Sequence, residues 1–111
     1  MPSNLEATFA ALGEPTRRAV VGLLSRGPRR AGDLADELGQ SAPAMSRHLR
    51  VLRRSGLIAP EEVDADARVR LYRLQKAPFD QMRGWLDEVE LFWGEQLDAF
   101  HAHVVARNGE Q

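Results

Sequence analysis

Cysteine is absent from the 111-residue sequence, so disulfide bonds, thiolate metal sites and thiol redox chemistry are excluded. The sequence also lacks a signal-like start and any apolar run that approaches the length needed to cross a bilayer. These absences predict a soluble, cytoplasmic protein that does not bind membranes. A chain of this length should form one domain, and its modest core would gain stability from dimerisation.

Catalytic patterns are absent as well. The sequence has only three histidines, no glycine-rich phosphate loop and no nucleophile paired with a base, so we expect neither an enzyme nor a cofactor. His101 and His103 lie two residues apart in a predicted helix and therefore do not share a face. They predict no metal site by themselves, although an intersubunit site that adds Asp98 or Glu110 stays open.

Acidic residues are scarce in the middle of the chain and abundant at its C-terminal end. Residues 17–54 carry nine arginines and three acidic residues, whereas residues 77–111 carry two arginines and seven acidic residues. The overall net charge of −1 hides this segregation. The distribution predicts a basic face suited to a polyanion and an acidic C-terminal element held away from it.

Residues 33–57 have the pattern of two short helices joined by a tight turn. Gly39 follows the first apolar stripe, where a helix end favours a residue that tolerates positive φ. Ser41 is a suitable N-cap for the second helix, and Pro43 falls in its first turn. We expect the second helix to continue to about Ser55.

This second helix should be amphipathic. Met45, Leu49 and Leu52 recur at helical spacing and are expected to face the core. Between residues 40 and 58 there are four arginines and no acidic residue. The layout is that of a helix-turn-helix, in which the second helix contacts base edges in the major groove, so the stretch predicts nucleic-acid binding.

Two further helices are predicted before this pair, over residues 4–12 and 16–25. Pro15 suits the first turn of the second one, because its missing N–H costs little there. Arg17 and Arg18 should lie exposed in the same turn. They are interpreted either as solubilising charges or as contacts to nucleic acid.

After the helix pair, residues 58–63 and 69–74 are predicted to form a β-hairpin, which is the wing of a winged helix. Arg68 and Arg70 near its tip would lie beside the DNA backbone or minor groove. The hairpin also carries the acidic residues Glu61, Glu62, Asp64 and Asp66. We therefore expect a smaller contribution than usual from the wing, with Arg68 as its best contact.

A long helix is predicted over about residues 77–106, with an apolar stripe wider than one packed face requires. In so small a chain the second body that buries such a stripe is expected to be a second copy. The predicted dimer interface comprises Leu5, Phe9, Trp85, Val89, Phe92, Trp93 and Phe100.

The order of these elements resembles the ArsR/SmtB family of bacterial winged-helix transcriptional regulators. The resemblance is carried by the segments LGEPTRR (12–18), LADEL (34–38), SAPAMSRHLRVL (41–52), GLI (56–58) and RLYRL (70–74). It implies a mainly α fold with a small β-hairpin, as a single winged helix-turn-helix domain over residues 1–111. Its parts would be the helix-turn-helix at about 31–56, the wing at about 58–75 and a dimerisation helix at about 77–106. It further implies a homodimer, paired through its first and last helices, that represses from an inverted-repeat operator.

The resemblance also implies roles for individual residues. The base-reading positions of the family fall on Gln40, Ser41, Ala44, Ser46 and Arg47, and the wing contacts fall on Arg68 and Arg70. Arg50 corresponds to a phosphate contact, and Arg54 joins it on the outward side of the helix. His48, which lies near the apolar side, is interpreted as structural.

The sequence departs from the family at the sensor. The thiolate site of the family needs a Cys-x-Cys in the helix that here carries Asp33-Leu34-Ala35-Asp36-Glu37, and the spacing of its carboxylate–histidine site is also missing. The effector is therefore unknown, or the protein is regulated only through its abundance. The alternative function is a winged-helix protein–protein interaction module without specific DNA binding.

Overall fold

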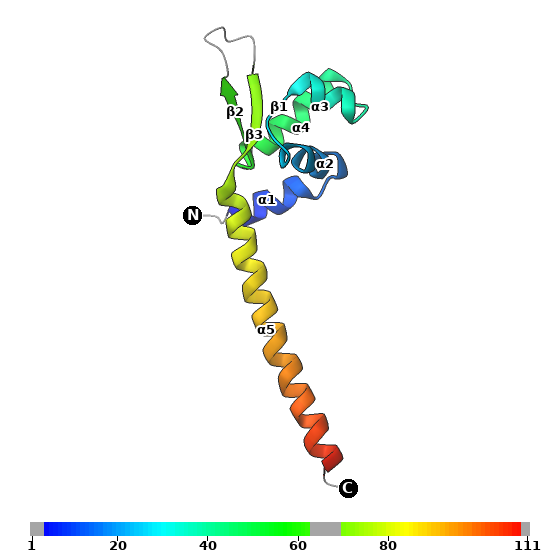
Figure 1. Ribbon diagram of the computed structural model, residues 1–111, viewed down its shortest axis with the longest axis vertical. Helices are drawn as coiled ribbons and strands as arrows, with labels where there is room; N and C mark the ends of the chain where they lie inside the picture. Colours follow the sequence, from blue (N-terminus) through cyan, green and yellow to red (C-terminus); the bar gives the residue numbers. More distant parts are fainter. Residues whose placement is uncertain (1–3, 63–69, 110–111) are drawn as a thin grey trace. The chain divides into compact units, whose positions relative to one another are not determined.

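The computed structural model describes residues 4–62 and 70–109 (Figure 1). The elements are α1 (Asn4–Leu12), α2 (Pro15–Leu24), β1 (Arg29–Arg30), α3 (Ala31–Glu37), α4 (Ala42–Arg54), β2 (Ile58–Glu62), β3 (Arg70–Leu74) and α5 (Lys76–Gly109). The chain forms two compact units, a first unit that ends at Phe79 and a second unit that begins at Asp80. Each unit is described by itself.

The sheet of the first unit has three antiparallel strands in the order β1-β3-β2. Tyr72, in the central strand β3, faces Arg29 of β1 on one side and Pro60 of β2 on the other. Pro60 is tolerated because β2 is an edge strand, where a missing N–H costs no ladder bond. The predicted fold class, mainly helical with a β-hairpin, is confirmed. The predicted hairpin gains a third strand, β1, which is only two residues long and therefore has no recognisable alternation.

The turn between α3 and α4 follows the predicted chemistry. Gly39 has a φ of 63°, which is the left-handed conformation that favours glycine. Ser41 is the N-cap of α4, and its hydroxyl oxygen accepts a hydrogen bond from the backbone N–H of Ala44 at 3.2 Å. The helix predicted to follow the Ser41 cap and to continue to about Ser55 spans Ala42–Arg54. The cap and the turn glycine together fix the start of α4.

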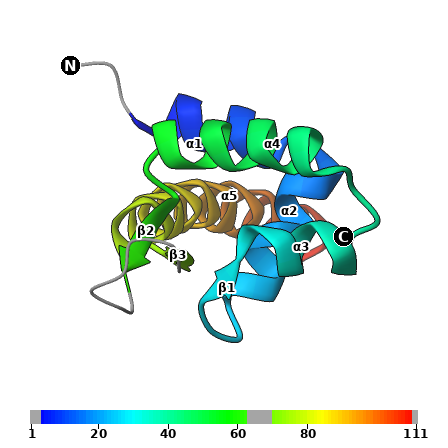
Figure 2. The same cartoon turned by 90° about the horizontal axis from the view of Figure 1, so that it is seen from above.

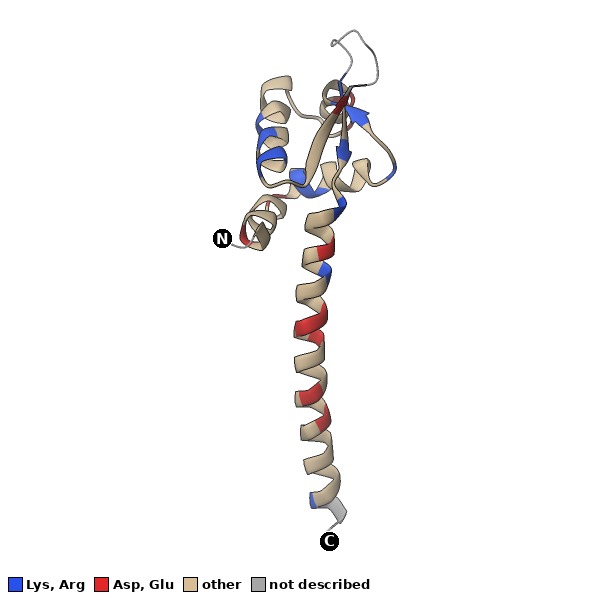
Figure 3. Cartoon of the chain, turned by 90° about the vertical axis from the view of Figure 1, so that its left-hand side faces the viewer, with Lys and Arg blue, Asp and Glu red and all other residues tan. Residues whose placement is uncertain are grey.

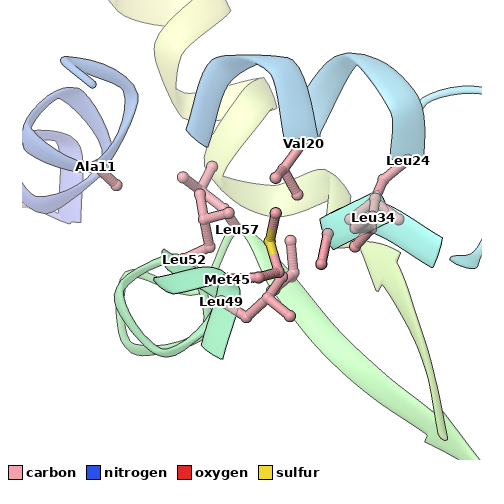
Figure 4. Close-up of a cluster of buried hydrophobic side chains, with 10 residues drawn as sticks. Ala11, Val20, Leu24, Leu34, Met45, Leu49, Leu52 and Leu57 are labelled. Carbon is pink, nitrogen blue, oxygen red and sulfur yellow. The ribbon is translucent and has the colours of Figure 1, made fainter. Parts of the chain in front are cut away.

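The core of the first unit is built around α4 (Figure 4). Met45, Leu49 and Leu52 are all at most 3% exposed, as their helical spacing predicted. They pack with buried apolar residues from the other helices, from β2 and from the turn before it: Ala11, Val20, Leu24, Leu34, Ala35, Leu57 and Ile58. Because α4 supplies both core side chains and exposed arginines, the position of its basic face is set by the core.

α1 turns a small polar residue and an alanine inward. Thr8 and Ala11 are buried, and the Thr8 hydroxyl donates to the carbonyl oxygen of Asn4 at 2.9 Å, so its burial leaves no unsatisfied donor. Phe9 is 40% exposed. The side of α1 that carries Phe9 is thus turned away from the core of the first unit.

Arg17 and Arg18 have a structural role that the sequence analysis missed. The Nε of Arg17 donates to the Ala11 carbonyl oxygen at 2.6 Å, and its Nη2 donates to that of Ala10 at 3.2 Å. Nη1 of Arg18 donates to the Leu12 carbonyl oxygen at 2.7 Å. These carbonyls belong to the last turn of α1, where the helix runs out of backbone donors; of the three, the Ala10 carbonyl also accepts from the backbone N–H of Gly13 at 3.3 Å. The two guanidinium groups therefore cap α1, and Arg17 is half-buried rather than exposed.

We expect Arg17→Ala to lower the free energy of unfolding by about 1–2 kcal/mol, because two charge-assisted hydrogen bonds to the α1 terminus are lost. Urea denaturation followed by far-UV circular dichroism measures this loss. Arg26→Ala is the matched control, since Arg26 is exposed and its removal changes the net charge equally. Equal stability of the two variants would contradict the capping role.

The second unit consists of α5 beyond Phe79, and it carries several exposed large apolar side chains. α5 has 34 residues in total. Phe92, Trp93, Leu97 and Phe100 are between 58% and 68% exposed. Within the described part of the chain, no helix has the length and apolarity required to span a membrane.

Candidate nucleic-acid interface

The outward face of α4 is basic (Figure 3). Arg47, Arg50 and Arg54 are exposed, and their spacing of three and four residues places them on one side of the helix, away from the core residues. Arg53 is exposed nearer to α3 and the sheet. In the described part of the chain, none of these four guanidinium groups is in an ion pair, whereas Arg29 pairs with Glu37 at 3.1 Å. Four unpaired arginines on one helix can bind phosphates and guanine edges.

The N-terminal end of α4 presents small polar groups beside these arginines. Ser41 and Ser46 are exposed, and although the Ser41 hydroxyl oxygen accepts from the Ala44 N–H, its O–H can still donate to a base or a phosphate. Gln40 and Ala44 are half-buried, and the backbone N–H of Gln40 donates to the Ala35 carbonyl oxygen at 2.9 Å. The structure thus brings the predicted base-reading residues to one end of α4, with Ser41, Ser46 and Arg47 the more accessible ones.

The predicted wing contacts divide into one described residue and one that is not. Arg70 is exposed at the start of β3, opposite Glu62 of β2 in the register. Arg68 lies outside the described residues. Glu61 is exposed on β2, so an acidic group shares the described part of the wing with Arg70.

His48 contacts the turn between α1 and α2. Its Nδ1 lies 3.7 Å from Oε2 of Glu14, and its side chain is 20% exposed. The backbone N–H of Arg17 donates to the same Oε2 at 2.9 Å and holds the pKa of the Glu14 carboxyl below its usual range, with a smaller contribution from His48. His48 therefore links α4 to the start of α2, which agrees with its interpretation as a structural residue.

A hollow of about 260 Å³ lies between α3, α4 and β3. Its inner wall includes the buried side chains of Met45 and Leu49, and Arg50, Arg53 and Tyr72 also line it. Sequence reasoning missed this site because Tyr72 and α4 are brought together only by the fold. The apolar and aromatic residues within 70–74 were the one available signal, and they do not reveal what each face of the strand contacts.

The described residues contain no group of three or more metal-ligating side chains. Asp98, His101 and His103 are exposed on α5, and Glu110 lies outside the described residues.

Comparison with known proteins places these features in a family. Residues 12–61 match the helix-turn-helix domain family. The chain is 34% identical over 105 residues to the HTH-type transcriptional regulator Rv2034 of Mycobacterium tuberculosis, which covers 95% of this chain and 92% of that protein. It is 39% identical over 51 residues to the transcriptional repressor SdpR of Bacillus subtilis, covering 46% of this chain and 57% of that one.

Solved structures of transcriptional regulators have a similar fold. A crystal structure of an ArsR family transcriptional regulator superposes with a TM-score of 0.74 at 37% identity, covering 83% of this chain and 98% of that one. An ArsR-like transcriptional regulator from Rhodococcus sp. RHA1 gives a TM-score of 0.73 at 30% identity, covering 87% and 89%.

The fold and the basic face of α4 define a winged helix-turn-helix DNA-binding protein. The chain belongs to the ArsR family of transcriptional regulators, which confirms the resemblance drawn from its motifs.

Proposed function

We propose that this regulator is a homodimeric repressor that binds an inverted-repeat operator, with one α4 helix in each half-site and no catalytic step. The observation that carries the proposal is the row of exposed, unpaired arginines on α4. The helix itself begins directly after the Ser41 cap. Repression is supported by the likeness to SdpR, which is named a transcriptional repressor. The protein–protein interaction module remains the competing function.

In this proposal the DNA-contacting residues divide into two groups. Residues in the turn before α4 and in its N-terminal half contact base edges: Gln40, Ser41, Ala44, Ser46 and Arg47. Basic residues further along α4 and in the wing contact the sugar–phosphate backbone: Arg50, Arg54, Arg68 and Arg70. Arginine offers two parallel donors to guanine O6 and N7, whereas phosphate contacts set orientation without reading sequence.

Dimerisation is supported by the exposed apolar face of α5. Phe92, Trp93 and Phe100 are each at least 60% exposed, and monomeric proteins rarely expose so many large apolar side chains together. By helical spacing, the acidic residues of α5 fall on other parts of its surface than these apolar side chains. The proposed interface comprises Leu5, Phe9, Trp85, Val89, Phe92, Trp93 and Phe100.

Binding to the DNA upstream of its own coding sequence tests the proposal. We expect the wild type to prefer this duplex over a scrambled one, and Arg47→Ala to bind it about 10- to 100-fold more weakly, since a bidentate base contact contributes about 1–3 kcal/mol. Fluorescence anisotropy with a labelled duplex measures both affinities.

Arg83→Ala on α5 is the matched control, because it removes the same charge from outside the first unit. It should bind like the wild type. Weak and equal binding of the wild-type protein to both duplexes would overturn the repressor function and favour the interaction module.

A further inference from the structure

The hollow between α3, α4 and β3 is lined by both apolar and cationic side chains. All three elements belong to the first unit, and Figure 2 shows them from above. The apolar wall of the hollow comprises the half-buried Ala31 and the exposed Ala42 beside the buried Met45 and Leu49. Its other lining residues include Ser46, Arg50 and Arg53, which are all exposed. An apolar wall beneath cationic and hydroxyl groups fits a ligand that is itself part apolar and part anionic.

The charged groups at the hollow are available for an external anion. Arg50 and Arg53 are three residues apart on α4, so their side chains are neighbours on the helix surface. Neither is in an ion pair within the described residues. Tyr72 reaches the same hollow from β3, and its half-buried phenol carries a hydroxyl donor. Two guanidinium groups and a hydroxyl are donors that suit the oxygens of a phosphate.

The hollow is continuous with the proposed DNA-binding face of α4, because Ser46 and Arg50 belong to both. We propose that the hollow binds one sugar–phosphate unit of the DNA backbone. The phosphate contacts Arg50, Arg53 and the Tyr72 hydroxyl, and the deoxyribose packs against the apolar wall. This inference rests on the proposed function and adds two contacts, Arg53 and Tyr72, that the sequence did not suggest.

In such a contact, α4 of the helix-turn-helix and β3 of the sheet would bind the same DNA backbone. It would position α4 in the groove and carry no sequence information of its own. A free phosphate ester shares this chemistry. The continuity with α4 and the apolar wall beside the arginines favour the backbone, where sugar and phosphate alternate.

Arg53→Ala and Tyr72→Phe test the assignment, with anisotropy titrations of operator and scrambled duplexes at three salt concentrations. We expect Arg53→Ala to weaken binding to both duplexes by a similar factor and to reduce the slope of log affinity against log salt by about 1. Tyr72→Phe removes only the hydroxyl. It should weaken binding about three- to tenfold on both duplexes and leave the slope unchanged, because no charge is lost.

Arg73→Ala is the matched control. Arg73 is exposed on β3 and adjoins Tyr72, so its side chain projects to the opposite face of the sheet. Arg73→Ala removes the same charge as Arg53→Ala, and both residues belong to the first unit. We expect its affinity and salt slope to equal those of the wild type.

Gly32→Ala separates ligand binding from stability. Gly32 lines the hollow, and a Cβ built on it meets no heavy atom within 4 Å, so a methyl group fits without a clash. Alanine is the better helix former, and the melting temperature should rise. If the backbone occupies the hollow, DNA binding should nevertheless weaken about two- to fivefold. Unchanged or tighter binding would contradict the occupancy.

The outcomes distinguish this inference from the proposed function. If the wild type recognises its operator and Arg47→Ala loses it, while Arg53→Ala and Tyr72→Phe bind like Arg73→Ala, only the inference is overturned. If the wild type recognises no operator, the proposed function fails and the inference fails with it. A free phosphate as occupant would make wild-type binding sensitive to inorganic phosphate at constant ionic strength. Arg53→Ala would then remove that sensitivity without weakening binding in chloride, which would overturn the assignment to DNA.

Discussion

The double substitution Trp93→Glu and Phe100→Glu should convert the protein to a monomer and weaken operator binding at least about 100-fold. The two side chains are seven residues apart and therefore lie on one face of α5, where they are 60% and 68% exposed. Placing carboxylates in an apolar interface costs several kcal/mol, because the charges lose their hydration without gaining partners. A monomer contacts only one half-site, so the affinity that comes from joining two half-sites is lost as well.

Sedimentation equilibrium measures the oligomeric state and anisotropy measures DNA binding in the same samples. Leu91→Glu is the matched control, because Leu91 is 67% exposed but lies about 200° around the helix from Trp93. It is flanked there by acidic residues such as Asp87 and Glu95. The control should stay dimeric and bind the operator. A double variant that remains dimeric would place the interface elsewhere.

The second large effect concerns the core. Leu52→Ala should lower the free energy of unfolding by about 2–5 kcal/mol, because Leu52 is fully buried and its truncation leaves a cavity. A loss of that size is a large fraction of the roughly 5–15 kcal/mol by which folded domains are stable. Since α4 carries both the core residues and the arginines, the variant should also lose DNA binding although Leu52 is expected to contact no DNA.

Urea denaturation at one fixed protein concentration measures this effect, because the proposed dimerisation would make the apparent stability depend on concentration. Val51→Ala is the control. It is the preceding residue in α4 and is 39% exposed, so its truncation should cost much less. Equal midpoints for the two variants would show that Leu52 is not a core residue in solution.

Sequence reasoning succeeded where the determinants are local. The Ser41 cap, the left-handed Gly39 and the buried face of Met45, Leu49 and Leu52 all depend on residues within a few positions of one another. Helix periodicity and cap chemistry are local rules, and they gave the helix-turn-helix and the core of α4.

It failed where the determinants lie between elements. The strand β1 exists only because Arg29 and Arg30 pair with β3, and two residues show no alternation. Arg17 looked like a surface charge because its acceptors, the terminal carbonyls of α1, are backbone groups that every sequence has. The hollow beside Tyr72 likewise depends on how the sheet packs against α4.

The guanidinium caps on α1 have a consequence for control of the protein. Arg17 fastens α1 to the start of α2, and Glu14 in the same turn meets His48 of α4. α1, which presents Phe9 outward, and the helix that carries the arginines are thus mechanically one body. In a dimer paired through α1, the geometry of the interface sets the distance between the two α4 helices. A small shift at that interface therefore changes the half-site spacing that the dimer can bind. A signal could therefore act by altering this geometry alone, without a thiol, a metal or a separate sensing domain.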